Sequence, residues 1–359
     1  MRDATCAVAG DLDGLRPHRT THRAGDEARR AGALDAALEQ LSAQAGDALS
    51  LHRLVEAGLD DLPLPGAGRT LLRWRRLAAV AAHDLALAKL FEGHTDALAI
   101  QAELGAPAPA AGSLWGTWCA EPPQARLRFE ADGTRYRLHG TKAWCSGAAQ
   151  LTHALVSGWN DDGQPCLAAV ALDAPGVTVT GLGWAAVGMG ETASVDVVFD
   201  GVPARPVGAP GDYTARPGFW QGGAGIAACW WGGARAVAGT ARALILARDE
   251  PHALAHLGAI DVAITAGAAV LRECAAWIDA HPRASAQVWA LRTRLAVEAA
   301  AETTVRHAGR AVGAGPLCRD ARFARAMADL PVFLRQSHAE RDLAALARPA
   351  ADTEAAWTL

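Results

Sequence analysis

The chain has 359 residues, a hydrophobic content of 51% and a formal net charge of −4. Its length suits two or three domains with sizeable cores. Its arginines are spread along the chain and form no basic stripe of the kind that binds nucleic acid, and no apolar run reaches the roughly 18–20 residues of a membrane helix. Seven scattered cysteines without a C-x-x-C pair suit a reducing cytoplasm and offer no zinc motif. The sequence therefore predicts a cytoplasmic protein without a metal, nucleic-acid or membrane partner.

The first third of the chain has a helical pattern. Residues 1–23 form a charged tail that lacks the apolar centre of a secretory signal. Residues 24–112 are predicted as an N-terminal helical domain, because leucine and alanine recur at helical spacing over Ala24–Ala45 and again over Thr70–Leu90. The residues expected on one buried face of the second stretch are Leu72, Leu77, Val80, Leu85 and Leu90.

Residues 113–208 consist of short apolar segments separated by turn signals such as Asp-Gly and Ala-Pro-Gly. Such alternation is typical of strands joined by tight turns. The pattern predicts a small antiparallel β-domain. Its expected strands include Arg135–Leu138, Ala154–Gly158, Gly176–Thr180 and Ser194–Phe199.

Residues 209–349 return to long helical patterns, and residues 350–359 form a short tail. Four consecutive long helices most simply form a bundle. These helices are expected at residues 223–248, 253–280, 285–312 and 320–347. The predicted fold class is multi-domain α+β, with an N-terminal α-helical domain, a middle antiparallel β-domain and a C-terminal four-helix bundle.

Three groups of motifs resemble the acyl-CoA dehydrogenase superfamily. The segments WCAEP at 118–122 and LHGTKAWCSGA at 138–148 are similar to the two flavin-facing strands of that family. GMGETAS at 188–194 is similar to the start of the strand that closes its β-domain, and RDAR at 319–322 to a segment near the end of its bundle. Together the matches span residues 118–322, and they imply a flavin held between the β-domain and the bundle.

The resemblance implies a set of flavin-binding residues in the two matching strands. They are Trp118, Cys119, Ala120, Glu121, Trp144, Cys145 and Ser146. An isoalloxazine needs an aromatic or apolar wall and donors directed at its polar edge. The two indoles are expected to supply the wall and Ser146 a donor at N5. The alternative is that both tryptophans belong to the core of the β-domain.

The expected cofactor is FAD, with FMN or a transiently held reduced flavin as alternatives. The family's block of residues that grips the pyrophosphate of a neighbouring subunit's FAD is absent after Arg248. Because the family builds its cofactor site across subunits, the resemblance also implies a homodimer or homotetramer.

The family's catalytic glutamate is missing. Counted from the RDAR segment, its position is Ala328, and the alternative location, residues 222–231, reads GGAGIAACWW without a carboxylate. The nearest carboxylate is Asp329, which would have a raised pKa in an apolar pocket, or which merely ends a helix before Pro331. His338, close to two carboxylates in the chain, is a second candidate acid or base, with a polar helix end as the alternative.

Candidate substrate contacts are Trp220, Trp230 and Met189. The tryptophans at the start of the bundle would fill much of the channel that fatty-acyl enzymes keep open, which favours a small or aromatic substrate. Core packing is the alternative explanation for these indoles.

Three functions follow as hypotheses. The first is a flavin-dependent oxidoreductase that oxidises an acyl thioester or a related small molecule by hydride transfer to flavin N5. The second is a flavin-dependent monooxygenase on the same fold, which the missing base favours. The third is a catalytically silent flavin-binding or scaffold protein.

Overall fold

The computed structural model describes residues 36, 38, 40, 50–122, 124–248 and 250–351. The predicted N-terminal tail, most of the helix expected at Ala24–Ala45 and most of the C-terminal tail lie outside these residues.

Within residues 50–122, the helices that precede the sheet are α2 (Leu51–Glu56), α3 (Thr70–His83) and α4 (Leu85–Glu103). The single helix expected over Thr70–Leu90 is divided at Asp84, whose backbone is extended and whose side chain accepts a hydrogen bond from the N–H of Leu87. Aspartate at this position caps a new helix by satisfying a free N–H in its first turn. The five apolar residues expected on the buried face are all buried, so the pattern was interpreted correctly and only the break was missed.

Seven strands follow, and five of them form a closed ring. The strands are β1 (Trp115–Trp118), β2 (Arg128–Asp132), β3 (Arg135–Cys145), β4 (His153–Asn160), β5 (Pro165–Ala171), β6 (Val177–Val179) and β7 (Val195–Pro206). The order is β1-β4-β2-β3-β7-β5, and β5 also pairs with β4, which closes the ring.

The sheet is mixed, so the prediction of a purely antiparallel β-domain was wrong. Both β1 and β2 run parallel to β4, while the other pairings are antiparallel. Turn signals identify hairpins between consecutive strands, but β4 is not consecutive with either of its parallel neighbours. A parallel pair needs a longer connection, which leaves no local signal in the sequence.

The chain then returns to helices. They are α5 (Asp212–Ala215), α6 (Gly218–Leu246), α7 (Pro251–Ala280), α8 (Gln287–Val312), α9 (Ala314–Arg319), α10 (Ala321–Phe333) and α11 (Glu340–Ala351). The fourth predicted helix, residues 320–347, is divided into α10 and α11. Pro331 lies inside α10; its ring lacks an N–H and crowds the preceding turn, and the helix gives way to a 3₁₀ turn, η2 (Leu334–Gln336).

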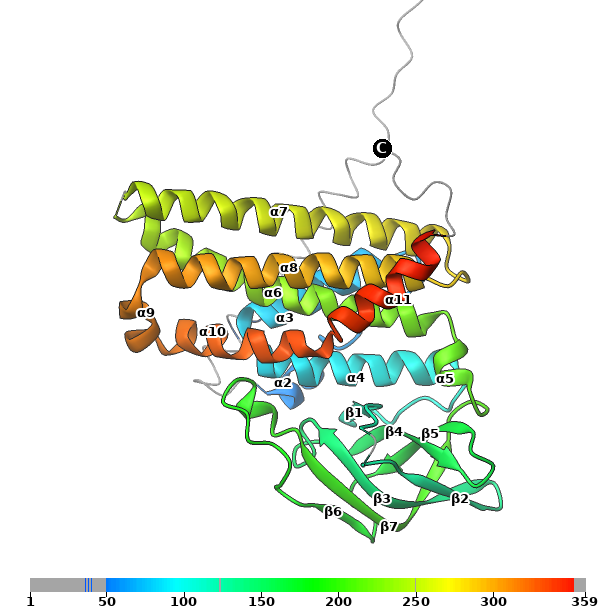
Figure 1. The fold of residues 1–359 in the computed structure, drawn as a ribbon. Coiled ribbons are helices and arrows are strands. Elements are labelled where there is room, and N and C mark those ends of the chain that lie inside the picture. The colour runs from blue at the N-terminus through cyan, green and yellow to red at the C-terminus, as the bar shows by residue number, and fades with distance from the viewer. Residues whose placement is uncertain are drawn as a thin grey trace, which may run out of the picture.

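Figure 1 shows the strands gathered at one end of the molecule, with α4 in the layer next to them and α7 on the outer side of the helices. One continuous hydrophobic core includes buried residues of the early helices, of the sheet and of the later helices. The division into three domains stays a prediction.

Helices α3 and α6 cross closely at Gly232. A methyl group there would overlap the carbonyl oxygen of Ala78 and lie 2.8 Å from the Ala78 Cα. Glycine is therefore required by the approach of the two backbones.

Helix α7 is, by length and composition alone, long and apolar enough to cross a membrane, and it is the one such helix in the described ranges. The expectation that no stretch reaches this length does not hold for α7. Helices of soluble proteins pass the same test.

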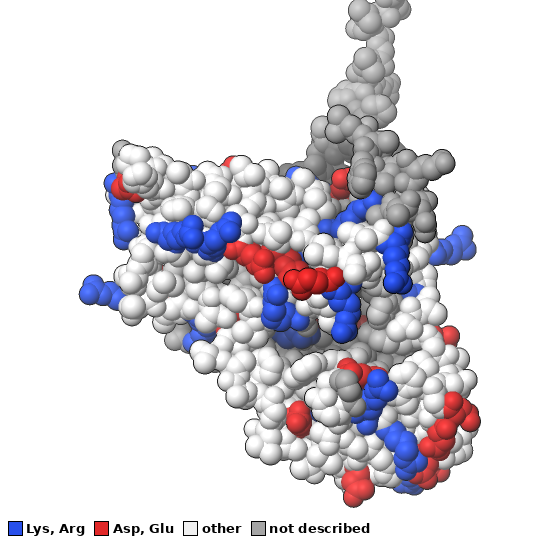
Figure 2. All heavy atoms as spheres, viewed as in Figure 1, with Lys and Arg blue, Asp and Glu red and all other residues white. Residues whose placement is uncertain are grey.

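Charged side chains of both signs share the face seen in Figure 2, where acidic groups lie between basic groups along the helices. No large area of a single sign covers this face. Arg335 pairs with buried Glu298 at 2.7 Å and with exposed Glu302 at 2.9 Å, and the exposed pair contributes little to stability.

Candidate functional site

Trp144 is turned outward by an irregularity in β3. Lys142 pairs with Val197 and Cys145 with Val195, so two residues of β3 lie opposite one residue of β7. Trp144 has a φ of 58°, in the left-handed region, and is 50% exposed. A bulky residue rarely adopts this backbone, and bulges often re-aim a side chain next to a functional site. The bulge presents an indole face at the surface beside Ser146.

Trp118 lies beneath that surface. Its side chain is 3% exposed, and its Nε1 donates to the carbonyl oxygen of Ser146 at 3.1 Å. The small cavity that these two residues help to line has a volume of about 10 Å³, roughly enough for one water molecule. Trp118 therefore supports the backbone of Ser146 from within, and this cavity is too small for a tricyclic ring.

Glu121 holds the loop after β1 through its side chain. Its carboxylate accepts from Ser157 Oγ at 2.5 Å and from Trp159 Nε1 at 2.7 Å, and it lies 3.7 Å from Lys142 Nζ. Lys142 is fully buried and donates to both oxygens of Ser157 at 2.9 Å. Burial lowers the pKa of Lys142. This inward network leaves the neighbouring Ala120 exposed at the surface, where its backbone N–H has no hydrogen-bond partner within the described ranges.

The two cysteines of the predicted site are not reactive thiolates. Burial raises the pKa of Cys119, and it raises the pKa of Cys145 to about 12. A thiol in this state stays protonated at neutral pH. Both side chains contribute packing: Cys145 is fully buried beneath the bulge and Cys119 is half-buried.

A chain of hydroxyl groups starts at Ser146. Its Oγ lies 2.7 Å from Ser194 Oγ, which lies 2.8 Å from Thr192 Oγ1. Thr192 Oγ1 in turn donates to the carbonyl oxygen of Met189 at 2.8 Å. Ser194, Thr192 and Met189 are buried, and Ser146 is half-buried.

Asp329 anchors the far end of this chain. Its Oδ1 accepts the backbone N–H of Met189 at 2.5 Å, and the side chain is 4% exposed. Burial raises the pKa of Asp329. Ala328, at the family's glutamate position, touches the loop through its backbone, because a methyl group on Gly188 would overlap its carbonyl. The structure thus joins three predicted residues, Ser146, Met189 and Asp329, in one hydrogen-bond network.

His338 lies outside this network, in the connection between η2 and α11. Its side chain is 63% exposed and its Nδ1 lies 3.4 Å from Asp342, which also accepts the backbone N–H of His338 at 3.0 Å. His338 and Asp342 thus form a polar pair at the start of α11, and the role of His338 as an acid or base stays a prediction.

The two candidate tryptophans of the bundle pack inside it. Trp220 is half-buried and meets Phe219 edge to face, with ring centroids 5.3 Å apart. Trp230 is fully buried, and the guanidinium of Arg294 lies 4.9 Å from its ring centroid. Their assignment as substrate contacts stays a prediction.

Sequence reasoning missed an ion pair on α4. Lys89 lines the same small cavity as Trp118 and Ser146, and its Nζ lies 2.8 Å from Glu92 Oε2. Burial raises the pKa of Glu92. One signal was available: the chain contains only two lysines, Lys89 and Lys142, and both lie at this site.

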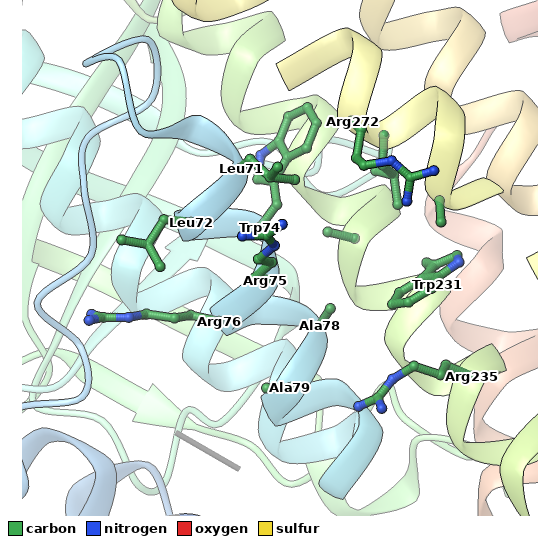
Figure 3. Close-up of a pocket in the computed structure, with 13 residues that line it drawn as sticks. Leu71, Leu72, Trp74, Arg75, Arg76, Ala78, Ala79, Trp231, Arg235 and Arg272 are labelled. Carbon is green, nitrogen blue, oxygen red and sulfur yellow. The ribbon is translucent and has the colours of Figure 1, made fainter. Parts of the chain in front are cut away.

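A larger cavity, of about 250 Å³, lies between α3, α6 and α7. Figure 3 shows Trp74 and Trp231 at its wall and arginines, including Arg235 and Arg272, around it. None of the predicted site residues lines it. In the described part of the chain, no group of three or more His, Cys, Asp or Glu residues is placed to hold a metal ion.

Searches with the sequence found no matching family model and no matching curated protein. Solved structures do match. FMN-bound TdsC from Paenibacillus sp. A11-2 is 19% identical, with a TM-score of 0.75 over 91% of this chain and 96% of that chain. Nitrososynthase from Micromonospora carbonacea var. africana is 20% identical, with a TM-score of 0.74 over 94% and 98%.

Methanesulfinate monooxygenase MsuC from Pseudomonas fluorescens is 18% identical, with a TM-score of 0.73 over 90% of this chain and 96% of that chain. These proteins and this chain share one arrangement over nearly their full lengths, which agrees with the fold implied by the sequence motifs. The chain has the fold of the acyl-CoA dehydrogenase superfamily.

Proposed function

We propose that the protein is a flavin-dependent monooxygenase that uses reduced FMN, molecular oxygen and a small apolar or aromatic substrate. When bound, the reduced flavin supplies two electrons to O₂, so that one oxygen atom enters the substrate and the other leaves as water. The chain's own residues bind and orient the flavin and the substrate.

The burial and hydrogen bonding of Asp329 favour this reaction over acyl-thioester oxidation. A dehydrogenase base must reach the substrate's α-proton. Asp329 is buried and already accepts the N–H of Met189, and Ala328 offers no carboxylate. Oxygen transfer from a reduced flavin needs no such base. Acyl-thioester oxidation, the first expectation from sequence, stays a prediction without this support.

The residues around Ser146 fit a flavin on the open side of the site. Trp144 offers a half-exposed ring face, Ala120 an unpaired N–H for the pyrimidine edge and Ser146 a hydroxyl oxygen. The similarity to FMN-bound TdsC, also described as dibenzothiophene monooxygenase, supports FMN and an aromatic substrate. FAD stays an alternative.

A second subunit is part of the proposal. Besides Trp144, the apolar side chains of Leu182 and Val187 are 70% and 92% exposed. We propose that these side chains contribute to a contact between subunits, because exposed apolar groups that lie together often mark an interaction site. A homodimer or homotetramer would cover them and close the flavin site.

The test is oxygen incorporation. Purified protein is supplied with FMN, NADH, a flavin reductase and indole or dibenzothiophene as probes under ¹⁸O₂. Product that carries one ¹⁸O atom and requires the protein is the expected result, and W144A should reduce it while the exposed variant D261N should not. Flavin uptake without product would favour the catalytically silent alternative, and reduction of bound flavin by an acyl thioester would favour the dehydrogenase.

A further inference from the structure

The cavity of about 250 Å³ between α3, α6 and α7 has an apolar floor and a basic edge. The buried residues that line it are Leu72, Trp74, Ala78, Ala228 and Leu271. The charged lining residues in the described part of the chain are all arginines, namely Arg75, Arg76, Arg235 and Arg272. Arg235 and Arg272 are exposed, so the cavity meets the surface at its basic edge.

The space exists because small side chains line it and a large one is held in place. Ala79 of α3 and Ala268 of α7 occupy positions where a longer side chain would fill the cavity. Trp231 is fixed at the wall, since its Nε1 donates to the carbonyl oxygen of Ile264 at 2.9 Å. An unfilled apolar space lowers the stability of a protein, whereas pockets that are already formed in the free protein are typical of small-molecule sites.

The size and walls of the cavity suit a compact aromatic body. An apolar cavity of about 150 Å³ is enough to hold benzene, so about 250 Å³ accommodates a larger body such as two fused rings. Trp74 and Trp231 present indole rings at the wall (Figure 3). Aromatic rings pair favourably with each other when stacked with an offset or edge to face.

The basic edge favours a negative charge on the ligand. Figure 3 shows Arg272 and Arg235 on either side of Trp231. Among the described residues, neither arginine forms an ion pair with a carboxylate, and no Asp or Glu lines the cavity. Arg76, by contrast, already donates to the carbonyl oxygen of Asp61 at 2.6 Å. A guanidinium group is well suited to bind a carboxylate or a similar oxyanion, because its N–H donors lie in one plane.

We propose that this cavity is a second small-molecule site, which binds an organic anion with a compact aromatic body. The rings of the ligand contact Trp74 and Trp231. Its carboxylate or sulfonate group lies at the edge of the cavity, beside Arg235 and Arg272.

The site is separate from the proposed flavin site. None of the residues assigned to the flavin lines this cavity. On α6, Trp231 lines the cavity, whereas its neighbour Trp230 is fully buried and contacts Arg294 of α8. Binding of the anion therefore does not depend on the proposed function.

The probe is 2-naphthylacetate, and 2-naphthylacetamide is the neutral comparison with the same rings. Isothermal titration calorimetry with the full-length protein measures both dissociation constants. Wild type is expected to bind the anion more tightly than the amide. R235Q/R272Q should weaken anion binding on the order of tenfold, as expected for the loss of hydrogen bonds to a charged group, and should leave amide binding unchanged. The matched control is R242Q, which changes an exposed arginine of α6 outside the cavity.

A second pair of variants locates the probe. A268F fills the cavity from α7 and should abolish binding of both compounds, whereas A269F, at the exposed neighbouring position, should not. W144A, which alters the proposed flavin site, should bind the anion as wild type does. Thermal unfolding checks that each variant is folded. The arginine variant changes exposed side chains and decides the role of the charge even if A268F does not fold.

Several results would overturn the proposal. One is the absence of anion binding by wild type, and another is equal binding of the anion and the amide. If folded A268F binds the anion as wild type does, the probe lies elsewhere, and a loss of binding in W144A alone would place it in the flavin site. If wild type binds no probe and A268F abolishes self-association in sedimentation velocity, the cavity is a contact between subunits instead.

Discussion

Replacement of Asp329 by alanine is expected to destabilise the protein by about 2 kcal/mol, and replacement by asparagine by much less. Alanine leaves the buried N–H of Met189 without its acceptor, and an unsatisfied buried donor costs roughly 1–3 kcal/mol. Asparagine keeps an oxygen at the same place and removes the charge. If Asp329 positions the loop, D329N should retain both stability and flavin binding.

The pH dependence gives a second check. Burial raises the folded-state pKa of Asp329, so the folded protein binds this proton more tightly than the unfolded chain does. The stability from the protonated form is complete below the unfolded pKa, about 3.9, and is lost as the pH rises through the folded pKa. D329N has no such loss, so its stability relative to wild type should increase over this window.

Urea unfolding of wild type, D329A and D329N at several pH values measures both effects, with D261N on the exposed face of α7 as the matched control. Equal destabilisation by D329A and D329N at neutral pH would refute the acceptor role. A difference between D329N and wild type that stays constant with pH would refute the burial argument. Loss of activity in D329N with unchanged stability and FMN affinity would instead make Asp329 a catalytic residue.

Three further results are expected. G232A should be less stable than G239A by about 1–3 kcal/mol in urea unfolding, because both gain the same helix propensity on α6 but only Gly232 meets the α3 backbone; equal stabilities would contradict the close crossing. E121A should lower the free energy of unfolding by about 3 kcal/mol in the same assay, since it removes the acceptor of two hydrogen bonds and the carboxylate beside buried Lys142. A decrease below about 0.5 kcal/mol would show that this network does not stabilise the protein. W144G should be more stable than W144A by about 0.5–1 kcal/mol, because glycine tolerates the left-handed backbone. Both variants should bind FMN at least about tenfold more weakly in a fluorescence titration, because they lack the aromatic ring. Unchanged FMN affinity would show that Trp144 is not part of the flavin site.

Much of the helical structure was predictable because it depends on local periodicity. The buried face from Leu72 to Leu90 follows from helical spacing, while the break at Asp84 depends on a single capping hydrogen bond. The parallel pairing of β1 with β4 joins strands that are distant in the chain, and no turn signal marks such a pair.

The sequence motifs predicted which residues belong to the candidate site, but they did not predict the side-chain orientations that packing determines. Trp118 and Trp144 occur in the same Trp-Cys dipeptide, yet one indole is buried and the other is turned outward by a bulge. The sequence pattern does not separate these two outcomes. Ser194 and Thr192 were part of a matching motif, but the contacts that join them to Ser146 depend on how the loop before β7 folds.

The closed ring of strands limits how this end of the molecule meets other proteins. Its five members pair with each other, although β2 meets β4 and β5 meets β7 through only two residue pairs each. The two strands outside the ring, β1 and β6, have only four and three residues. Only short stretches of main chain are left for an incoming strand to extend, which limits edge-to-edge polymerisation, a hazard of open sheets. A partner that binds at this end must therefore be recognised mainly by side chains and loops. Such contacts can be altered by single substitutions without changing the sheet.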